Sequence, residues 1–116
     1  MIHAAHASRY HWMHAGTVVN AVRGEWQCSR VYATLGRAEP AVAHARRALE
    51  LYENASDDAE DFDLPFCYEA LARAHAVAGE PDEARKWLDL ARQTGSEIAE
   101  DDDRELLMSD LATIPL

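Results

Sequence analysis

Two stretches of the sequence combine arginine with aromatic and acidic residues at helical spacing, an arrangement that can bind a carboxylate. The residues are Arg23, Trp26 and Arg30 in the first stretch, and Phe66, Glu69 and Arg73 in the second. Residues three, four or seven positions apart share one face of a helix. A guanidinium group pairs with a carboxylate through two hydrogen bonds and also stacks on aromatic rings. An alternative for Glu69 and Arg73 is an ion pair with each other, because they stand four residues apart in the favourable order.

Histidines are dense at the start of the chain and raise the question of a metal site. They are His3, His6, His11 and His14. His11 and His14 are one helical turn apart, so their ring nitrogens could share a metal ion. Further ligands would have to come from Glu25 or His44, and the sequence has no Cys-x-x-Cys or His-Glu-x-x-His motif. We therefore expect no cofactor, and we keep metal binding by His11 and His14 as an alternative.

The sequence contains no catalytic motif that we recognise. It has neither a glycine-rich phosphate loop nor a serine in a nucleophile elbow. Cys28 and Cys67 lie among apolar neighbours and have no local catalytic signature. We interpret both as buried thiols rather than as a disulfide, which fits a reducing cytoplasm. We therefore do not expect an enzyme.

The composition excludes several classes of partner. The 116-residue chain has a formal net charge of −10. A general nucleic-acid binder needs a basic face to displace counterions, and anionic lipid surfaces attract basic segments. No apolar run approaches the ~20 residues of a membrane span, and the start lacks the layout of a secretory signal. These features predict a cytoplasmic protein with neither nucleic-acid nor membrane partners.

Residues 66–91 have the pattern of two helices joined by a tight turn. Their sequence is FCYEALARAHAVAGEPDEARKWLDLA. Tyr68, Leu71 and His75 recur at three- and four-residue steps and therefore share a helical face. Gly79 suits the left-handed end of the first helix, and Pro81 suits the first turn of the second.

This pattern resembles the tetratricopeptide repeat (TPR), although His75 stands where that family usually has tyrosine. The residues that carry the resemblance are Tyr68, Leu71, Ala72, Gly79, Ala84, Leu88 and Ala91. A looser match indicates an earlier repeat and comprises Cys28, Tyr32, Gly36, Ala41, Ala45 and Ala48. The resemblance implies an all-α fold, a right-handed α-α superhelix of antiparallel helix pairs.

We expect a single TPR-like domain over residues 1–116. Its parts are a leading helix at 2–15, a first repeat at 18–52, a second repeat at 62–95 and a closing helix at 100–113. The two repeat glycines are further apart than the family's usual period of about 34 residues. The excess lies in the acidic stretch Glu53 to Asp63. We interpret this stretch as solvated, either as an extended loop or as a lengthened helix end.

The register of the first repeat gives Glu25 an unusual place, because the family usually has a large apolar residue there. A buried carboxylate must be paired, be hydrogen-bonded or take up a proton. The candidate partners are Arg9, Tyr10, His44 and Arg47. The alternative is a slip of one residue, which places Trp26 inside and Glu25 at the surface.

The resemblance also implies where a partner would bind. In TPR arrays the first helix of each repeat lines a concave face that commonly holds a peptide. Our first hypothesis is therefore a protein- or peptide-binding module whose concave groove, lined by arginine and tryptophan, accepts an anionic or carboxylate-bearing segment. Self-association as a homodimer is a further option, because a short repeat array leaves apolar helix faces near its ends. The alternative is a small-ligand or metal-binding protein that uses Glu25, His44 and the N-terminal histidines.

Overall fold

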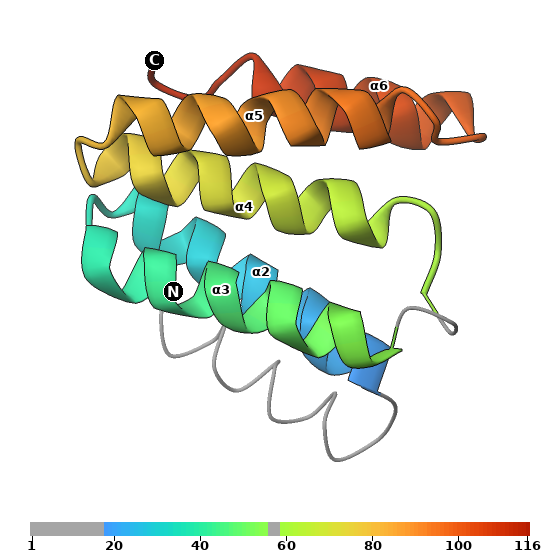
Figure 1. Cartoon of the computed structure of the whole chain (residues 1–116), viewed down its shortest axis with the longest axis horizontal. Helices are drawn as coiled ribbons and strands as arrows, with labels where there is room; N and C mark the ends of the chain where they lie inside the picture. The colour runs from blue at the N-terminus through green and yellow to red at the C-terminus, as the bar shows by residue number, and fades with distance from the viewer. Residues whose placement is uncertain (1–17, 56–58) are drawn as a thin grey trace.

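A computed structural model describes residues 18–55 and 59–116, and this part of the chain contains helices and no strand (Figure 1). The helices are α2 (Val18–Thr34), α3 (Ala38–Ala55), α4 (Asp63–Val77), α5 (Pro81–Gly95) and α6 (Asp101–Leu111). Consecutive helices pack against one another in pairs, α2 with α3 and α4 with α5. The predicted all-α class is therefore confirmed. The predicted leading helix at 2–15 lies outside the described residues.

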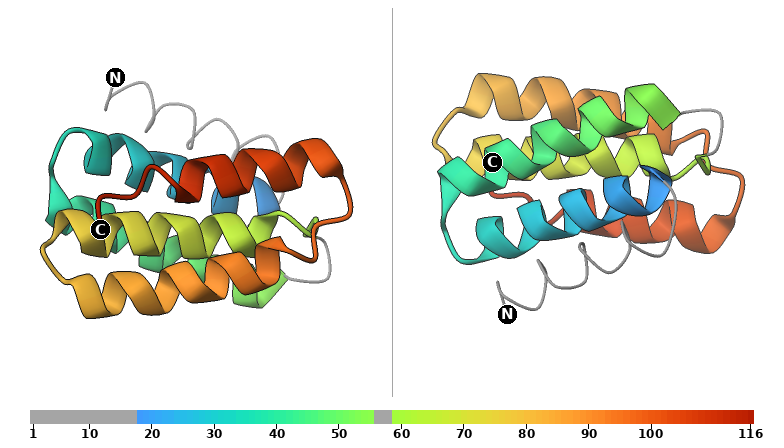
Figure 2. Two further views of the ribbon diagram at one scale, coloured as in Figure 1. Left: turned by 90° about the horizontal axis from the view of Figure 1, so that it is seen from above. Right: turned by 90° about the horizontal axis from the view of Figure 1, so that it is seen from below.

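Helix α4 lies in the middle of the molecule, with two of the other described helices on each side of it. Both views in Figure 2 place α2 and α6 on one side of α4, and α3 and α5 on the other. We call the side with α2 and α6 the inner face and the side with α3 and α5 the outer face. The inner face thus carries the first helix of each pair together with the closing helix.

Glycine and proline set the turn within each helix pair. Gly36 and Gly79 have φ angles of 73° and 76°, a left-handed conformation that residues with a Cβ rarely adopt. Pro81 occupies the first turn of α5, where its missing N–H group costs no hydrogen bond. Each turn therefore returns the chain alongside the helix it has just left.

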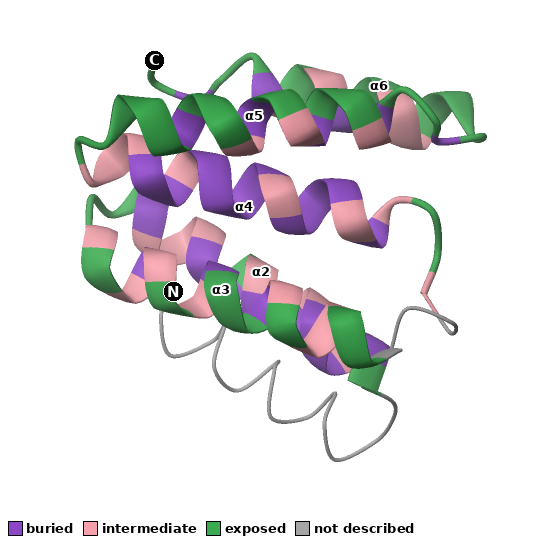
Figure 3. Ribbon diagram, viewed as in Figure 1, coloured by how far each residue is buried: buried purple, intermediate pink, exposed green. Residues whose placement is uncertain are grey.

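Small side chains allow the paired helices to approach closely. Figure 3 colours the buried positions of the helices purple. Ala41, Ala45 and Ala48 of α3 are fully buried, as are Ala84 and Ala91 of α5. Because alanine adds little volume, the backbones of each pair can pack at short range. These alanines recur every three, four or seven residues, which is the spacing of one helical face.

The closing helix packs against the second pair through apolar contacts. Leu107 and Leu111 of α6 are buried, with 0% and 4% of their surface exposed. Gly95, at the end of α5, leaves the room for this contact, because a Cβ on Gly95 would lie 2.2 Å from Leu107 Cδ2. A side chain at Gly95 would therefore force the buried Leu107 side chain to move.

The acidic stretch Glu53 to Asp63 does not behave as one solvated segment. Helix α3 continues to Ala55, which agrees with a lengthened helix end. Asp63 was expected to be solvated, but it is fully buried at the start of α4. The reason is an ion pair with α2, described below.

Candidate binding site on the inner face

Arg23 is fixed by a carboxylate on the neighbouring pair. Its Nε and Nη2 atoms donate to the two carboxylate oxygens of Asp63, at 2.9 and 3.0 Å. Its guanidinium carbon lies 5.0 Å from the centre of the Phe62 ring, within reach of a cation–π interaction. The Asp63 hydrogen bond raises the pKa of Arg23. The arginine predicted to face a ligand therefore binds a residue of its own chain.

Trp26 of α2 and Phe66 of α4 form an aromatic wall. Their rings are stacked, with centroids 5.2 Å apart and planes inclined by 17°. Phe66 is buried, whereas Trp26 is partly exposed and packs against the apolar cluster that includes Leu107 and Leu111. The Trp26 Nε1 atom is buried, and it has no hydrogen-bond acceptor in the described part of the chain. The closing helix thus covers part of the wall that the sequence assigned to a groove.

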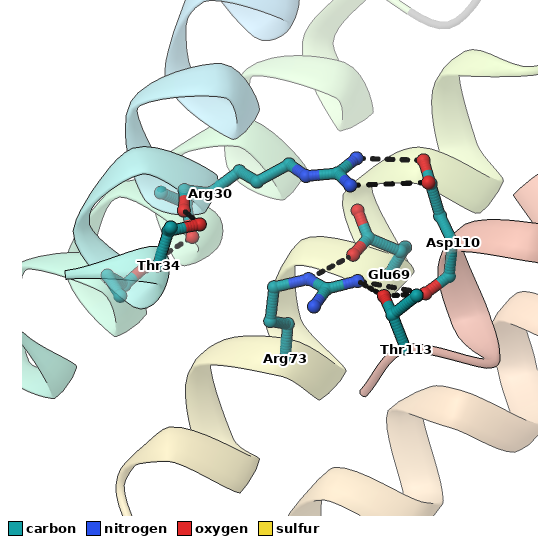
Figure 4. Close-up of polar contacts among 8 residues, drawn as sticks. Arg30, Thr34, Glu69, Arg73, Asp110 and Thr113 are labelled. Carbon is teal, nitrogen blue, oxygen red and sulfur yellow. Dashed lines mark hydrogen bonds and ion pairs between the residues drawn. The ribbon is translucent and has the colours of Figure 1, made fainter. Parts of the chain in front are cut away.

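Arg30 reaches across α4 to the closing helix, as Figure 4 shows. Its two terminal nitrogens donate to the Asp110 carboxylate, at 2.7 and 3.2 Å. The side chains remain accessible to water, with 40% of Arg30 and 15% of Asp110 exposed. The hydrogen bond to Asp110 raises the pKa of Arg30. A carboxylate therefore binds Arg30 in the bidentate way that the sequence suggested, but it comes from α6.

Arg73 connects Glu69 to the end of α6 (Figure 4). Together with Arg30 and Asp110, these residues form one polar cluster. The Nε of Arg73 donates to Glu69 at 2.7 Å, and its Nη2 donates to the Asp110 carbonyl at 2.9 Å and to the Thr113 hydroxyl at 2.7 Å. Glu69 is 1% exposed, so it lies in the interior and pairs with Arg73, which is the alternative that their spacing in the sequence suggested. Burial raises the pKa of Glu69, against the opposing effect of the Arg73 charge.

An open pocket of about 270 Å3 borders this cluster. It lies between the ends of α2 and α4 and the residues that follow α6. Its walls are formed by Ala33, Thr34, Arg73, Val77, Thr113 and Pro115. The Nη1 atom of Arg73 has no acceptor within the described ranges, so its N–H groups are available beside this space.

Two carboxylates that organise the inner face, Asp63 and Asp110, were not predicted from the sequence. Asp63 was assigned to the acidic run before α4. A signal for Asp110 was present, because it stands three residues after Leu107 and one before Leu111, on the apolar stripe of α6. An acidic residue on a buried stripe needs a cationic partner, and two arginines on the inner helices could provide one.

The predicted buried polar group consists of Glu25, His44 and Arg47, and the structure brings them together. Glu25 is 1% exposed, and its carboxylate lies 2.7 Å from His44 Nδ1. Arg47 Nε is 3.7 Å from the same carboxylate, but the arginine itself is exposed. Arg9 and Tyr10, the other candidate partners, lie outside the described residues. The contact between Glu25 and His44 joins α2 to α3. Trp26, the next residue along α2, is partly exposed.

The metal alternative gains no support from the described helices. No three His, Cys, Asp or Glu residues lie close enough to share a metal ion in residues 18–55 and 59–116. His3, His6, His11 and His14 lie outside these ranges. Cys28 and Cys67 are buried and do not form a disulfide, and burial raises the pKa of the Cys67 thiol. None of the helices described is long and apolar enough to cross a membrane.

Comparison with known families bears on the second helix pair. Residues 65–89, which extend from the start of α4 into α5, match a family model described as the tetratricopeptide repeat. Searches of curated proteins and of solved structures gave no significant match. The match and the packed helix pairs together fit a TPR-like repeat protein. The predicted resemblance is therefore confirmed.

Proposed function

We propose that this protein is an interaction module whose inner face binds an anionic, carboxylate-bearing segment of a partner protein or peptide. The tetratricopeptide repeat match supports a protein-interaction repeat module in general terms. The chemistry proposed for the partner rests on the arginines of α2 and α4. A cytoplasmic location, as expected from the sequence, is part of the proposal.

The observation that carries the proposal is the contact between Arg30 and Asp110. Arg30 holds a carboxylate through two hydrogen bonds, and that carboxylate stands on a helix that lies along the inner face. An acidic segment of a partner can use the same chemistry because exposed ion pairs exchange at little cost in free energy. Asp110 is then a competitor that a partner carboxylate replaces.

Arg73 gives the partner a second point of attachment. The pocket of about 270 Å3 beside it is open, and three apolar residues in its walls, Ala33, Val77 and Pro115, suit an aliphatic side chain. A segment that replaces Asp110 at Arg30 could extend into this space. Such a partner combines a carboxylate with small apolar residues.

The test begins with a pull-down that uses the full-length chain as bait. The affinity of the captured partner is then measured by calorimetry for the parent, Arg30→Ala and Arg73→Ala proteins. Each variant should weaken binding by about 1–3 kcal/mol, as expected for the loss of a charge-assisted hydrogen bond. Added salt should weaken binding to the parent, since exposed charges are screened beyond ~8–10 Å.

Arg85→Ala is the matched control, because Arg85 is exposed on α5 and contacts only Asp82 among the described ion pairs. Asp110→Asn should strengthen binding, since it removes the competing carboxylate. Equal affinities for the parent, Arg30→Ala and Arg73→Ala proteins would rule out the inner face as the site.

Self-association is a second proposal, carried by exposed apolar residues near the C-terminal end. Leu106 on α6 and Leu116 are 55% and 52% exposed. A symmetric dimer would cover such residues. Light scattering should give twice the monomer mass for the parent and the monomer mass for Leu106→Glu. A monomeric parent across the micromolar range contradicts this proposal.

A further inference from the structure

A second open pocket, of about 490 Å3, lies away from the inner face. It lies where the first turns of α3 approach the turn between α4 and α5, at the end of the molecule that Figure 1 shows on the left. Its walls are formed by Ala38, Glu39, Val42, Ala43, Arg46, His75, Ala78 and Glu80. This volume is within the range of small-ligand sites. None of these residues takes part in the contacts of Arg23, Arg30 or Arg73.

His75 and Glu80 form a fixed polar pair at this pocket. The Nδ1 atom of His75 lies 2.8 Å from Glu80 Oε1, and the imidazole is almost fully buried. The backbone is fixed as well, because the Glu80 N–H donates to the His75 carbonyl at 2.9 Å and Gly79 is left-handed. Just over half of the Glu80 side chain is exposed. Its carboxylate is therefore held at the pocket edge.

The polar atoms at this end of the pocket are mainly hydrogen-bond acceptors. Glu39 contributes a second carboxylate from α3, and it forms no ion pair in the described part of the chain. The Nδ1 atom of His75 is already engaged with Glu80, so it does not add a free donor to the pocket. A group that satisfies these atoms must donate several hydrogen bonds. A positive charge is favoured because both carboxylates are negative.

Two features of the pocket could instead favour an anion. The starts of α3 and α5 both carry partial positive charge, but each first turn already contains acidic residues, Glu39 in α3 and Asp82 and Glu83 in α5. Arg46 is the second feature. It stands seven residues after Glu39, which is about 10 Å along the helix. The cation therefore belongs at the Glu39 end, with Arg46 at the other.

We propose that this pocket binds an ammonium group on a short aliphatic stem. The ammonium group lies against Glu39 and Glu80, and the stem lies over Ala38, Ala43 and Ala78. A lysine side chain of a partner protein and a free alkylamine share this chemistry. The site is independent of the inner face, since it selects the opposite charge and lies on different residues.

The test is an NMR titration of the isotope-labelled full-length protein with three probes. The first is Nα-acetyl-lysine methylamide, and the second is its norleucine counterpart, which has the same stem without the ammonium group. The third is n-butylammonium chloride. The lysine probe should shift the amide signals of Glu39, Ala43 and Glu80 and bind about tenfold more tightly than the norleucine probe. Tighter binding of the lysine probe than of butylammonium indicates a partner side chain, and equal binding indicates a free amine.

Variants at exposed positions distinguish binding in the pocket from a general effect of the protein's charge. Glu39→Gln should weaken the lysine probe roughly fivefold, and Ala43→Phe should abolish binding by filling the pocket. Glu50→Gln is the matched control, because it removes the same charge from an exposed position further along α3. Arg46→Gln should leave the affinity unchanged or increase it.

Three results would overturn the proposal. They are equal binding of the lysine and norleucine probes, shifts confined to residues outside the pocket, and a loss of affinity in Glu50→Gln as large as in Glu39→Gln. Failure of this site leaves the inner-face interaction intact, since that interaction is measured with Arg30 and Arg73 variants.

Discussion

The two arginines of α2 each bind a carboxylate through two hydrogen bonds but in different surroundings. Arg23 pairs with Asp63, which is fully buried and also accepts a hydrogen bond from the Glu60 N–H at 2.9 Å. Arg30 pairs with Asp110, and both side chains remain in contact with water. The first pair ties adjacent helices together, whereas the second extends from α2 to the closing helix.

This difference assigns the pairs different roles. A buried carboxylate that loses its cation is left without compensation, so the Arg23–Asp63 pair is needed for the fold. A pair that stays in contact with water contributes less, on the order of 1 kcal/mol, because water and salt screen the attraction. The Arg30–Asp110 pair can therefore open at smaller cost, as the proposed binding of a partner carboxylate requires.

Removal of the buried carboxylate should have the largest effect. Asp63→Ala should lower the free energy of unfolding by about 3 kcal/mol, because it leaves Arg23 partly buried without a partner and the Glu60 N–H without an acceptor. Urea denaturation monitored by circular dichroism measures this. The control is Asp82→Ala, which also removes an acidic residue from a helix first turn, but at an exposed position. An equal effect of both variants would mean that Arg23 does not need Asp63.

The closing helix should depend more on packing than on its ion pair. Gly95→Ala should cost about 1–3 kcal/mol, since the new methyl group overlaps the buried Leu107 side chain. The double variant Gly95→Ala, Leu107→Ala removes the atom that clashes. In a double-mutant cycle, Gly95→Ala should therefore cost less when Leu107 is already alanine. Purely additive effects would contradict a close approach at Gly95.

Asp110→Asn should change the free energy of unfolding by less than about 1 kcal/mol, since the pair is only partly buried and keeps contact with water. Hydrogen exchange of the last turn of α6 should nevertheless become faster, because Arg30 holds it less firmly, although the bonds of Arg73 to the Asp110 carbonyl and to Thr113 remain. Urea denaturation and hydrogen exchange by mass spectrometry check the two effects separately. A loss as large as that of Asp63→Ala would show that the Arg30–Asp110 pair is structural and would remove the distinction between the two pairs.

Local patterns in the sequence were sufficient to predict the helix pairs. Gly36, Gly79 and Pro81 determine backbone conformation directly, and the alanine stripes of α3 and α5 can face only another helix. The second pair was the clearer of the two, and it is the one that the repeat match covers.

The partners of the arginines could not be predicted from local patterns. Asp63 is 40 residues from Arg23, and Asp110 is 80 residues from Arg30, so only the packing of α4 and α6 decides these contacts. A charged residue in an acidic run is expected to be solvated unless the fold places a cation beside it. Arg23 is such a cation for Asp63. Arginine spacing suggested that a carboxylate pairs with Arg30, but it could not show that Asp110 of the same chain provides one.

The smallest effect concerns Glu69, which lies beside the Arg30–Asp110 pair (Figure 4). Burial raises its pKa above the ordinary value of 4.5, despite the nearby Arg73. The folded state therefore holds this proton more tightly than the unfolded state does, and the resulting stability is fully present below pH 4.5. It is lost as the pH rises through the raised pKa. Glu69→Gln has no such titration, so the parent should lose stability relative to the variant as the pH rises from 4.5 towards neutrality. Urea denaturation of both proteins across that range tests the sign. A parent that instead gains stability relative to Glu69→Gln would mean that the attraction of Arg73 outweighs the effect of burial on the pKa of Glu69. The Glu69–Arg73 pair would then resemble the Arg23–Asp63 pair more than the Arg30–Asp110 pair.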